Sequence, residues 1–540
     1  MRRFLSSLTI GAALLLSAAQ VSAQSVDVSQ LDAAQSFDTG PLNPSNGGLD
    51  PALWQGLSAE RAQRYISAAN DQNLSELPSA FFRRILLSAG VPPQGEAEQI
   101  SAFDKARTQA QLKLGDRLAL ENLSNPQNPL QRDAVFRTQL ALSSGDNQAA
   151  CSEADREIDN RGAPFWMQMR IICHIMREET AAAELTLNLL RDQDGADPNF
   201  TSLANHVLGL RKNPPTDLPQ GDPLIDTLGS LDTDGAVQTE ASYAAAALSD
   251  ATLADDRLVA MFKAKDRLSK EQVKSILSSL LFSDADLAGG ASFDIDSTLA
   301  GLQDDSTWTK SVAQAYNLAN NTDDPASASQ AVAALLNLAE TMDYVPQMSR
   351  HLSDVIAFIP AARQAQLDAE RFAWAALRRG DLSTLASIYR ELEAEEPLAS
   401  RIALASDALG NGFLLGQLGV DIEARLEGEG NVRAQAVRDS LIALALGAQL
   451  SDKAALSLEQ DDTSETLNPL DLAEMNTLAK SNARAGTLLK VVSSMGERSP
   501  SDLSNLEIYS YISALSTAGL TREAGELAAY DFLAHTPKTE

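Results

Sequence analysis

The chain has 540 residues and a formal net charge of −30, because 73 acidic residues outnumber 43 basic ones. Apolar residues make up 44% of the sequence, which is enough to build a packed core and excludes a chain that is disordered throughout. The acidic balance repels phosphate backbones and anionic lipids, so we do not expect nucleic acid as a partner.

The N-terminus has the pattern of a secretory signal peptide. Arg2 and Arg3 form a basic start, and an apolar run of 12 residues extends from Leu8 to Ala19. Small residues then predict cleavage near Ala23. A membrane span needs about 20 apolar residues, so this run is too short to be one. We expect the mature protein in the periplasm or outside the cell, without an integral membrane span.

Changes in composition divide the chain into five expected segments. The richest cluster of prolines, with several Asp and Gly residues, predicts a linker between two helical parts. A further division of the second part near residue 320 or 460 stays open. The segments are a signal peptide at 1–23, a flexible leader at 24–50, an N-terminal helical-repeat block at 51–210, a Pro/Asp/Gly-rich linker at 211–239 and a C-terminal helical-repeat block at 240–540.

Amphipathic helical patterns dominate from residue 51 onward. Ser269 and Gln272 form a capping box, which satisfies free backbone donors at the start of a helix. The apolar residues that follow, up to Leu281, recur at helical spacing, and residues 382–392 have the same pattern. Aromatic residues are only 5% of the chain, whereas sheets are enriched in them. The sequence therefore predicts an all-α protein of helical hairpins joined by short turns.

Three turns share a spacing of glycine, small or aromatic residues, and proline. Glycine tolerates the positive φ that ends a helix, and proline stops the helix that follows. The units are Gly380 with Leu385, Tyr389, Leu392 and Pro397; Gly145 with Ala150, Ala154 and Pro164; and Gly519 with Ala524, Ala528 and Pro537.

These units resemble tetratricopeptide repeats, whose consensus has glycine, small, aromatic and proline residues at these offsets. The sequence departs from the consensus at Leu385, Glu157 and Asp531, where a small residue is expected. The resemblance implies an α-solenoid, in which stacked hairpins form a surface for peptides or partner helices. An irregular helical bundle with glycine turns is the alternative.

Cys151 and Cys173 are the only cysteines, and they are equidistant from Gly162, where the pattern predicts a hairpin turn. The sequence therefore predicts a structural disulfide in an oxidising compartment. A redox-active pair lacks its C-x-x-C spacing, and two buried thiols are the remaining alternative. We expect both cysteines on apolar faces, Cys151 with Ala154 and Ile158, and Cys173 with Trp166, Met169 and Met176.

The four histidines do not form a metal-binding motif. His174 and Glu178 are spaced i, i+4, but two ligands do not make a zinc site. We therefore interpret them as an ordinary pair on one helix face. The other three histidines, His206, His351 and His535, are far apart in the sequence.

Acidic residues are frequent but do not predict a reaction. Asp232-Thr233-Asp234-Gly235 resembles part of a calcium loop, yet Ser230 and Ala241 stand at two of the ligand positions, with Glu240 one residue early. Pairs such as Asp255–Asp256 and Asp304–Asp305 cannot be assigned as acid and base without a cleft. No phosphate-binding loop, dinucleotide fingerprint or nucleophile elbow occurs. We predict no catalytic, cofactor-binding or metal-binding residue.

The leading functional hypothesis is a non-enzymatic periplasmic scaffold or adaptor that binds other proteins, with a role in cell-envelope organisation suggested by analogy. One alternative is the helical superstructure of a cell-wall-acting enzyme. The helical pattern over 470–540 leaves no room there for a separate catalytic domain. The other alternative is a periplasmic chaperone or carrier for apolar ligands in a helical groove.

Overall fold

The computed structural model describes residues 40–534 apart from 127, 194, 217, 220, 233–236, 238, 250–251, 282–293, 305, 394–396, 411–421, 423–424, 450, 453–454 and 456–467. The predicted signal peptide and residues 24–39 of the predicted leader lie outside this part. Within it the regular elements are helices, and the only β pairing is two isolated bridges, Leu42–Ser88 and Ser58–Gln94. The prediction of an all-α protein is confirmed.

The helices fall into four consecutive groups. The N-terminal group is α1 (Ala59–Asn70), α2 (Glu76–Leu87), α3 (Ala97–Leu114) and α4 (Arg117–Leu123). The disulfide lobe is η1 (Pro129–Arg132), α5 (Ala134–Ser143), α6 (Asn147–Arg156), α7 (Pro164–Met176), α8 (Thr180–Arg191), α9 (Pro198–Val207) and α10 (Pro223–Ser230). The middle group is α11 (Glu240–Leu248), α12 (Ala254–Lys263), η2 (Lys265–Arg267), α13 (Lys270–Leu281), α15 (Ile295–Gly301), α16 (Trp308–Asn321), α17 (Pro325–Thr341), α18 (Val345–His351) and α19 (Ser353–Phe358). The C-terminal group is α20 (Ala361–Arg379), α21 (Leu382–Glu391), α22 (Pro397–Leu409), α24 (Gly430–Ala445), α26 (Pro469–Lys480), α27 (Arg484–Met495), η3 (Pro500–Asp502), α28 (Asn505–Thr517) and α29 (Thr521–Ala534).

The predicted glycine turns separate packed helix pairs. Gly145, Gly380 and Gly519 have φ values of 76°, 66° and 74°, in the left-handed region that glycine adopts without strain. They lie between α5 and α6, α20 and α21, and α28 and α29, and the two helices of each pair are in contact. The capping box before α13 also forms, since the amide of Ser269 donates to Oε1 of Gln272 at 2.8 Å. These helices therefore begin and end where the sequence predicts.

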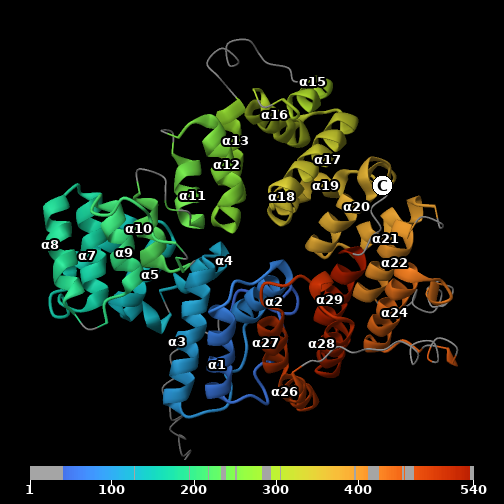
Figure 1. Ribbon diagram of the computed structural model, residues 1–540, viewed down its shortest axis with the longest axis horizontal. Helices are drawn as coiled ribbons and strands as arrows, with labels where there is room; N and C mark the ends of the chain where they lie inside the picture. The colour runs from blue at the N-terminus through green and yellow to red at the C-terminus, as the bar shows by residue number, and fades with distance from the viewer. Residues whose placement is uncertain are drawn as a thin grey trace, which may run out of the picture.

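The chain returns towards its starting point, so that its first and last described helices lie side by side. Figure 1 shows the four groups following one another around the molecule, with α1 and α2 next to α27. The same packing extends to α29, because α2 is joined to it by ion pairs. The first and last groups thus form a single junction, although hundreds of residues separate them.

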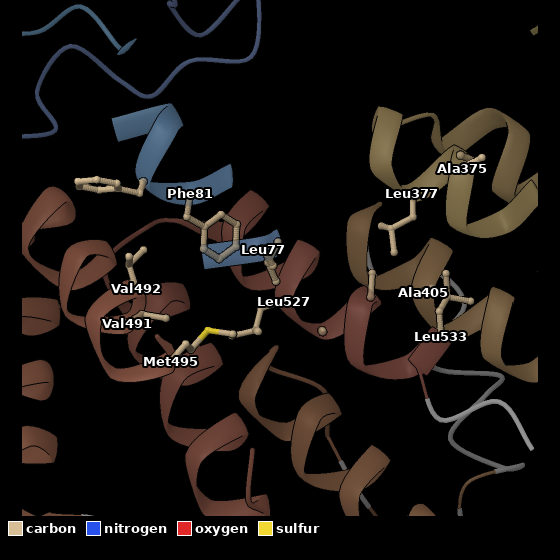
Figure 2. Close-up of a cluster of buried hydrophobic side chains, with 14 of the residues drawn as sticks. Leu77, Phe81, Ala375, Leu377, Ala405, Val491, Val492, Met495, Leu527 and Leu533 are labelled. Atoms are coloured by element: carbon tan, nitrogen blue, oxygen red, sulfur yellow. The ribbon is translucent and has the colours of Figure 1, made fainter. Parts of the chain in front are cut away.

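The hydrophobic core is continuous across this junction. In Figure 2, Leu77 and Phe81 of α2 lie among Val492 and Met495 of α27 and Leu527 of α29. One cluster of buried residues includes side chains from the N-terminal, middle and C-terminal groups. A core built from both ends of the sequence ties the first helices to the last ones.

The disulfide lobe has a separate cluster of buried residues. Part of the range 211–239, which the sequence predicts to be a linker, belongs to this cluster. Within that range, α10 contributes Leu224, Ile225 and Leu228 to the lobe's core. Pro223 starts this helix and Asp222 caps it, accepting from the amides of Leu224 and Ile225. Proline therefore marks a helix start here rather than an open linker.

The described end of the predicted leader is also packed. Leu42 and Leu49 are buried, and the amide of Leu42 donates to the carbonyl of Leu87 at 3.1 Å. The amide of Ala89 donates back to the carbonyl of Leu42 at 2.9 Å. Over residues 40–50 the expectation of a flexible leader is therefore wrong, because these backbone groups bond to the end of α2.

Candidate functional site

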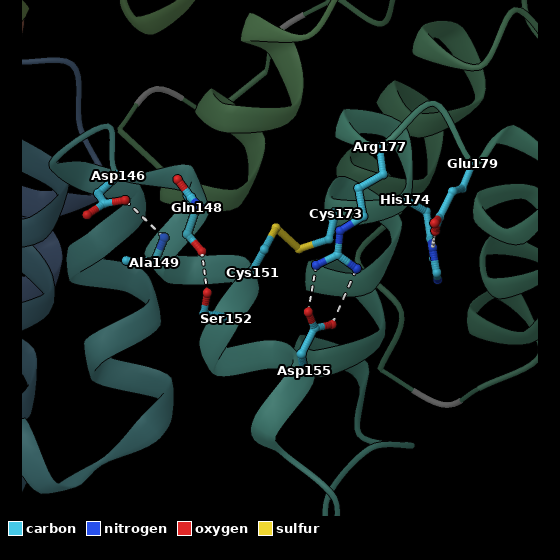
Figure 3. Close-up of a disulfide and its surroundings, with 10 residues drawn as sticks. All are labelled: Asp146, Gln148, Ala149, Cys151, Ser152, Asp155, Cys173, His174, Arg177 and Glu179. Carbon is cyan, nitrogen blue, oxygen red and sulfur yellow. Dashed lines mark hydrogen bonds and ion pairs between the residues drawn. A yellow bond between two sulfur atoms is a disulfide. The ribbon is translucent and has the colours of Figure 1, made fainter.

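The structure joins Cys151 of α6 to Cys173 of α7 in a disulfide, with their Cα atoms 5.7 Å apart. Figure 3 shows the bond crossing between the two helices, with Arg177 and Asp155 beside it. That ion pair joins the same two segments, with Nη2 of Arg177 2.6 Å from Oδ2 of Asp155. Both sulfurs lie in the buried core of the lobe, so the pair has the environment of a structural disulfide.

The expected neighbours of the disulfide are only partly found. Ala154, Trp166 and Met169 are buried as predicted. Ile158 is exposed because α6 ends at Arg156, which takes Ile158 off the helix face. Met176 is also exposed, since it is the last residue of α7. The predicted helical faces therefore extend too far at both ends.

His174 pairs with a different acid from the one that helical spacing predicts. Glu178 has a φ of 59° and lies beyond the end of α7, so it is not on the helix face. Instead Nδ1 of His174 lies 2.6 Å from Oε2 of Glu179, as the right side of Figure 3 shows. This is a contact between two side chains near the surface.

The other described histidines are buried in separate places. Nε2 of His206 lies 3.6 Å from Oδ1 of Asp232, and Nε2 of His351 lies 3.0 Å from the hydroxyl of Tyr344. Burial lowers the pKa of His351 to about 4, so it is neutral at pH 7. His535 lies outside the described residues.

The aspartates considered as acid–base pairs or calcium ligands bond to different neighbours. Asp255 accepts a hydrogen bond from the hydroxyl of Thr309, and Asp304 accepts from the amide and hydroxyl of Ser306. Asp305 and, in the resembled calcium loop, Thr233, Asp234 and Gly235 lie outside the described residues. No group of three or more metal-ligating side chains occurs among the residues that the structure describes.

A pocket that sequence reasoning missed lies in the middle group, and we call it the α11–α18 pocket. It lies where α11, the end of α12 and η2 meet the turn between α17 and α18, and its volume is about 390 Å³. Its lining residues are Glu240, Tyr243, Phe262, Lys263, Lys265, Met342 and Asp343. They come from two segments about 80 residues apart, so no local pattern could bring them together.

The floor of the α11–α18 pocket is a packed aromatic cluster. Phe262 is fully buried and packs edge-on against Tyr344, with ring centroids 5.2 Å apart. The ring of Trp308 lies behind it at 6.4 Å. Tyr344 is itself held by its hydrogen bond to His351. Such edge-on contacts fix ring positions, so these buried rings form a rigid support beneath the pocket.

The charges around this floor are largely paired with one another. Nζ of Lys265 lies 3.2 Å from Oδ2 of Asp343, across the two sides of the pocket. Oε2 of Glu240 lies 3.9 Å from Nε of Arg267, and burial raises the pKa of this glutamate. Lys263 instead lies over the ring of Tyr243, with Nζ 5.0 Å from the centroid. Within the described part of the chain, this lysine makes no ion pair.

The backbone at the pocket is unusual on both sides. Lys265 and Asp343 have φ values of 46° and 51°, which residues other than glycine rarely adopt. Each follows the end of a helix, and their side chains then form the ion pair across the pocket. Left-handed residues other than glycine cost free energy and persist where the surrounding contacts hold them, often at functional sites.

A second hollow, of about 270 Å³, lies between α3 and α10 and includes Lys113 and Asp222. Its charged groups already serve the fold. Lys113 donates to the backbone carbonyl of Asn70, and Asp222 caps α10. This leaves the α11–α18 pocket as the better candidate for binding.

The fold and the site define the class of this chain as an all-α protein of packed helix pairs that carries a small pocket with paired charges. No protein-family model, no curated protein and no solved structure matches it. Among the described residues, none of the helices has the length and apolar character that crossing a membrane requires.

Proposed function

We propose that this protein is a non-enzymatic scaffold that binds other proteins in the periplasm after its signal peptide is removed. The observation that carries the proposal is the continuous core shared by the N-terminal, middle and C-terminal groups, to which the disulfide lobe adds a core of its own. A body of this kind keeps its surface helices in fixed positions, which reduces the entropy cost of binding a partner.

Ion pairs between helices that are distant in sequence support this rigidity. Arg378 of α20 donates to Glu76 of α2 at 2.7 and 3.0 Å, and the hydroxyl of Tyr530 of α29 donates to the same glutamate at 3.0 Å. Arg438 of α24 donates to Asp531 of α29 at distances down to 2.6 Å. These contacts join helices from distant parts of the chain at fixed geometry.

The disulfide supports the proposed location. Disulfides form and persist in oxidising compartments, such as the periplasm, and are rare in the cytosol. The apolar run before Ala23 has the pattern of a signal peptide and therefore also supports export. A tetratricopeptide-like or related α-solenoid is the repeat class that we propose for the helix pairs.

The proposal is tested by affinity purification of the tagged, processed protein from envelope extract, followed by quantitative mass spectrometry. We expect a defined protein to be enriched over an unrelated acidic exported bait, and to bind again when both are purified. Degradation of cell-wall polymer by the pure protein would instead favour the enzyme alternative. Co-purified lipid in stoichiometric amount would favour the carrier.

A further inference from the structure

The size of the α11–α18 pocket limits what it can hold. Ligand pockets range from about 300 to 1,000 Å³, and this one lies near the lower end at about 390 Å³. That volume suits one or two amino-acid side chains rather than a helix or a large cofactor. Phe262 is buried beneath the pocket, whereas Lys263 and Asp343 are exposed at its rim. A short end of a longer molecule therefore fits it best.

The floor and the rim of the pocket favour two different chemical groups on the ligand. Met342 and the ring of Tyr243, which are both half-buried, provide an apolar contact surface above the buried Phe262. Apolar groups leave water for such a surface without needing a hydrogen-bonding partner. The ligand should therefore carry an apolar or aromatic group that reaches the floor.

Lys263 favours a negative charge on the group of the ligand that lies at the rim. Both acidic side chains of the pocket have a cationic neighbour, Asp343 at Lys265 and Glu240 at Arg267. Lys263 lies over the face of Tyr243 and makes no ion pair with a described residue, so its ammonium can still pair with an anion. The negative charge of the rest of the chain is screened beyond about 10 Å at moderate salt, which leaves this local cation effective.

We propose that the α11–α18 pocket binds the free C-terminus of a partner polypeptide whose last residue is apolar or aromatic. The last side chain packs on Met342 and Tyr243, and the terminal carboxylate pairs with Lys263. This inference rests on the proposed scaffold function, because it takes the ligand to be part of a protein. The remainder of the partner leaves the pocket across its exposed rim.

The test is fluorescence polarisation with the full processed chain and a fluorescein-labelled peptide, Gly-Ser-Gly-Ser-Ala-Phe, with a free C-terminus. We expect saturable binding that weakens about tenfold when the peptide is amidated, since a charge-assisted hydrogen bond is lost. A peptide ending in Ser should also bind more weakly. Equal binding of the acid and the amide, or no saturable binding, would overturn the inference.

Matched variants locate the site. Lys263→Gln should weaken binding of the free-acid peptide about tenfold and leave binding of the amide unchanged. Lys274→Gln removes an exposed lysine of α13 outside the pocket and should change neither. Met342→Glu places a charge at the floor and should abolish binding while circular dichroism confirms the fold. An unchanged affinity in both pocket variants would place the peptide elsewhere and contradict the inference.

Two further experiments distinguish a peptide ligand from a small molecule, and the pocket inference from the scaffold proposal. Free 3-phenylpropionate that competes as strongly as the peptide would identify a small-molecule carboxylate site and overturn the polypeptide assignment. If a purified partner binds wild type and Lys263→Gln equally, the pocket inference fails and the scaffold function survives. If peptides bind but no partner is found in envelope extract, the scaffold proposal fails by itself.

Discussion

Arg84 of α2 and Glu523 of α29 are 439 residues apart in the sequence, and their side chains meet at 2.5 Å. The guanidinium also donates to Glu526 at 2.8 and 2.9 Å. Only 12% of the Arg84 side chain and 4% of the Glu523 side chain are exposed. Burial alone would lower the pKa of Arg84, but attraction to Glu526 and Glu523 outweighs it and raises the pKa. The junction of the N-terminal and C-terminal groups therefore depends on this arginine.

Replacing this arginine should loosen the junction. We expect Arg84→Leu to lower the free energy of unfolding by about 3–5 kcal/mol, because it leaves a buried carboxylate without its cation. Urea unfolding followed by circular dichroism measures this. Arg117→Leu is the control, since Arg117 and its partner Glu121 are 70% and 58% exposed and exposed pairs of this kind contribute little to stability. Equal effects of the two substitutions would contradict the assigned role of Arg84.

The disulfide should stabilise its lobe more than the rest of the molecule. It closes a loop over a sequence separation of 22, for which the chain-entropy estimate is about 3 kcal/mol. We expect a Cys151→Ala/Cys173→Ala variant to exchange amide hydrogens faster in α6 and α7, while α27 keeps its protection. Peptide mapping without reduction checks the pairing in the wild type. Unchanged exchange in α6 and α7 would show that the bond adds little.

His351 should make the protein less stable in mild acid. Its pKa is about 4 in the folded state against 6.5 for an exposed histidine, because burial disfavours the charged form. The unfolded state then binds more protons between these values, so the contribution is complete above pH 6.5 and is lost as the pH falls towards 4. The loss amounts to about 3 kcal/mol.

Comparing His351→Gln with the wild type isolates this effect. The difference in the free energy of unfolding between the two proteins should change steadily from about pH 7 to about pH 4.5. Lys270, Glu271 and Arg350 also act on this histidine electrostatically and are retained in the comparison. His174→Gln, at a half-buried surface histidine, is the matched control. A constant difference across this range would rule out His351 as the titrating group.

Where the space around a glycine is open, we expect substitution to cost stability only if φ is positive. Gly380 has a φ of 66°, and no atom lies within 4 Å of the point that a Cβ would occupy, so Gly380→Ala is penalised by the backbone alone. We expect a loss of about 1 kcal/mol in thermal or urea unfolding. Gly162 has equally open space without a positive φ, and Gly162→Ala should be neutral or slightly stabilising. A reversed order would contradict the assigned turn conformations.

The helices, their caps and the disulfide could be predicted because each depends on residues close in sequence. Ser269 and Gln272 are three residues apart, and Gly380 ends a helix through its own φ. Cys151 and Cys173 face one another because a single hairpin turn lies between them. The failures at Ile158 and Glu178 are also local, since a periodic pattern does not state where the helix ends.

The departure of Asp531 from the repeat consensus shows the limit of such reasoning. At a position where the consensus has a small residue, the structure has a fully buried carboxylate paired with Arg438. That arginine is 93 residues away in the sequence. Spacing within one hairpin cannot predict this contact, because the partner belongs to another helix pair.

The sequence by itself determined the all-α class, the hairpin turns and the cysteine pairing, since hydrogen bonds and side-chain contacts within one or two helices encode them. The tertiary structure alone decided that the chain closes from Arg84 to Glu523, and that Lys265 and Asp343 meet across a pocket. Those contacts join residues 439 and 78 positions apart. Their geometry depends on how many helix pairs turn between them, which no local pattern of residues records.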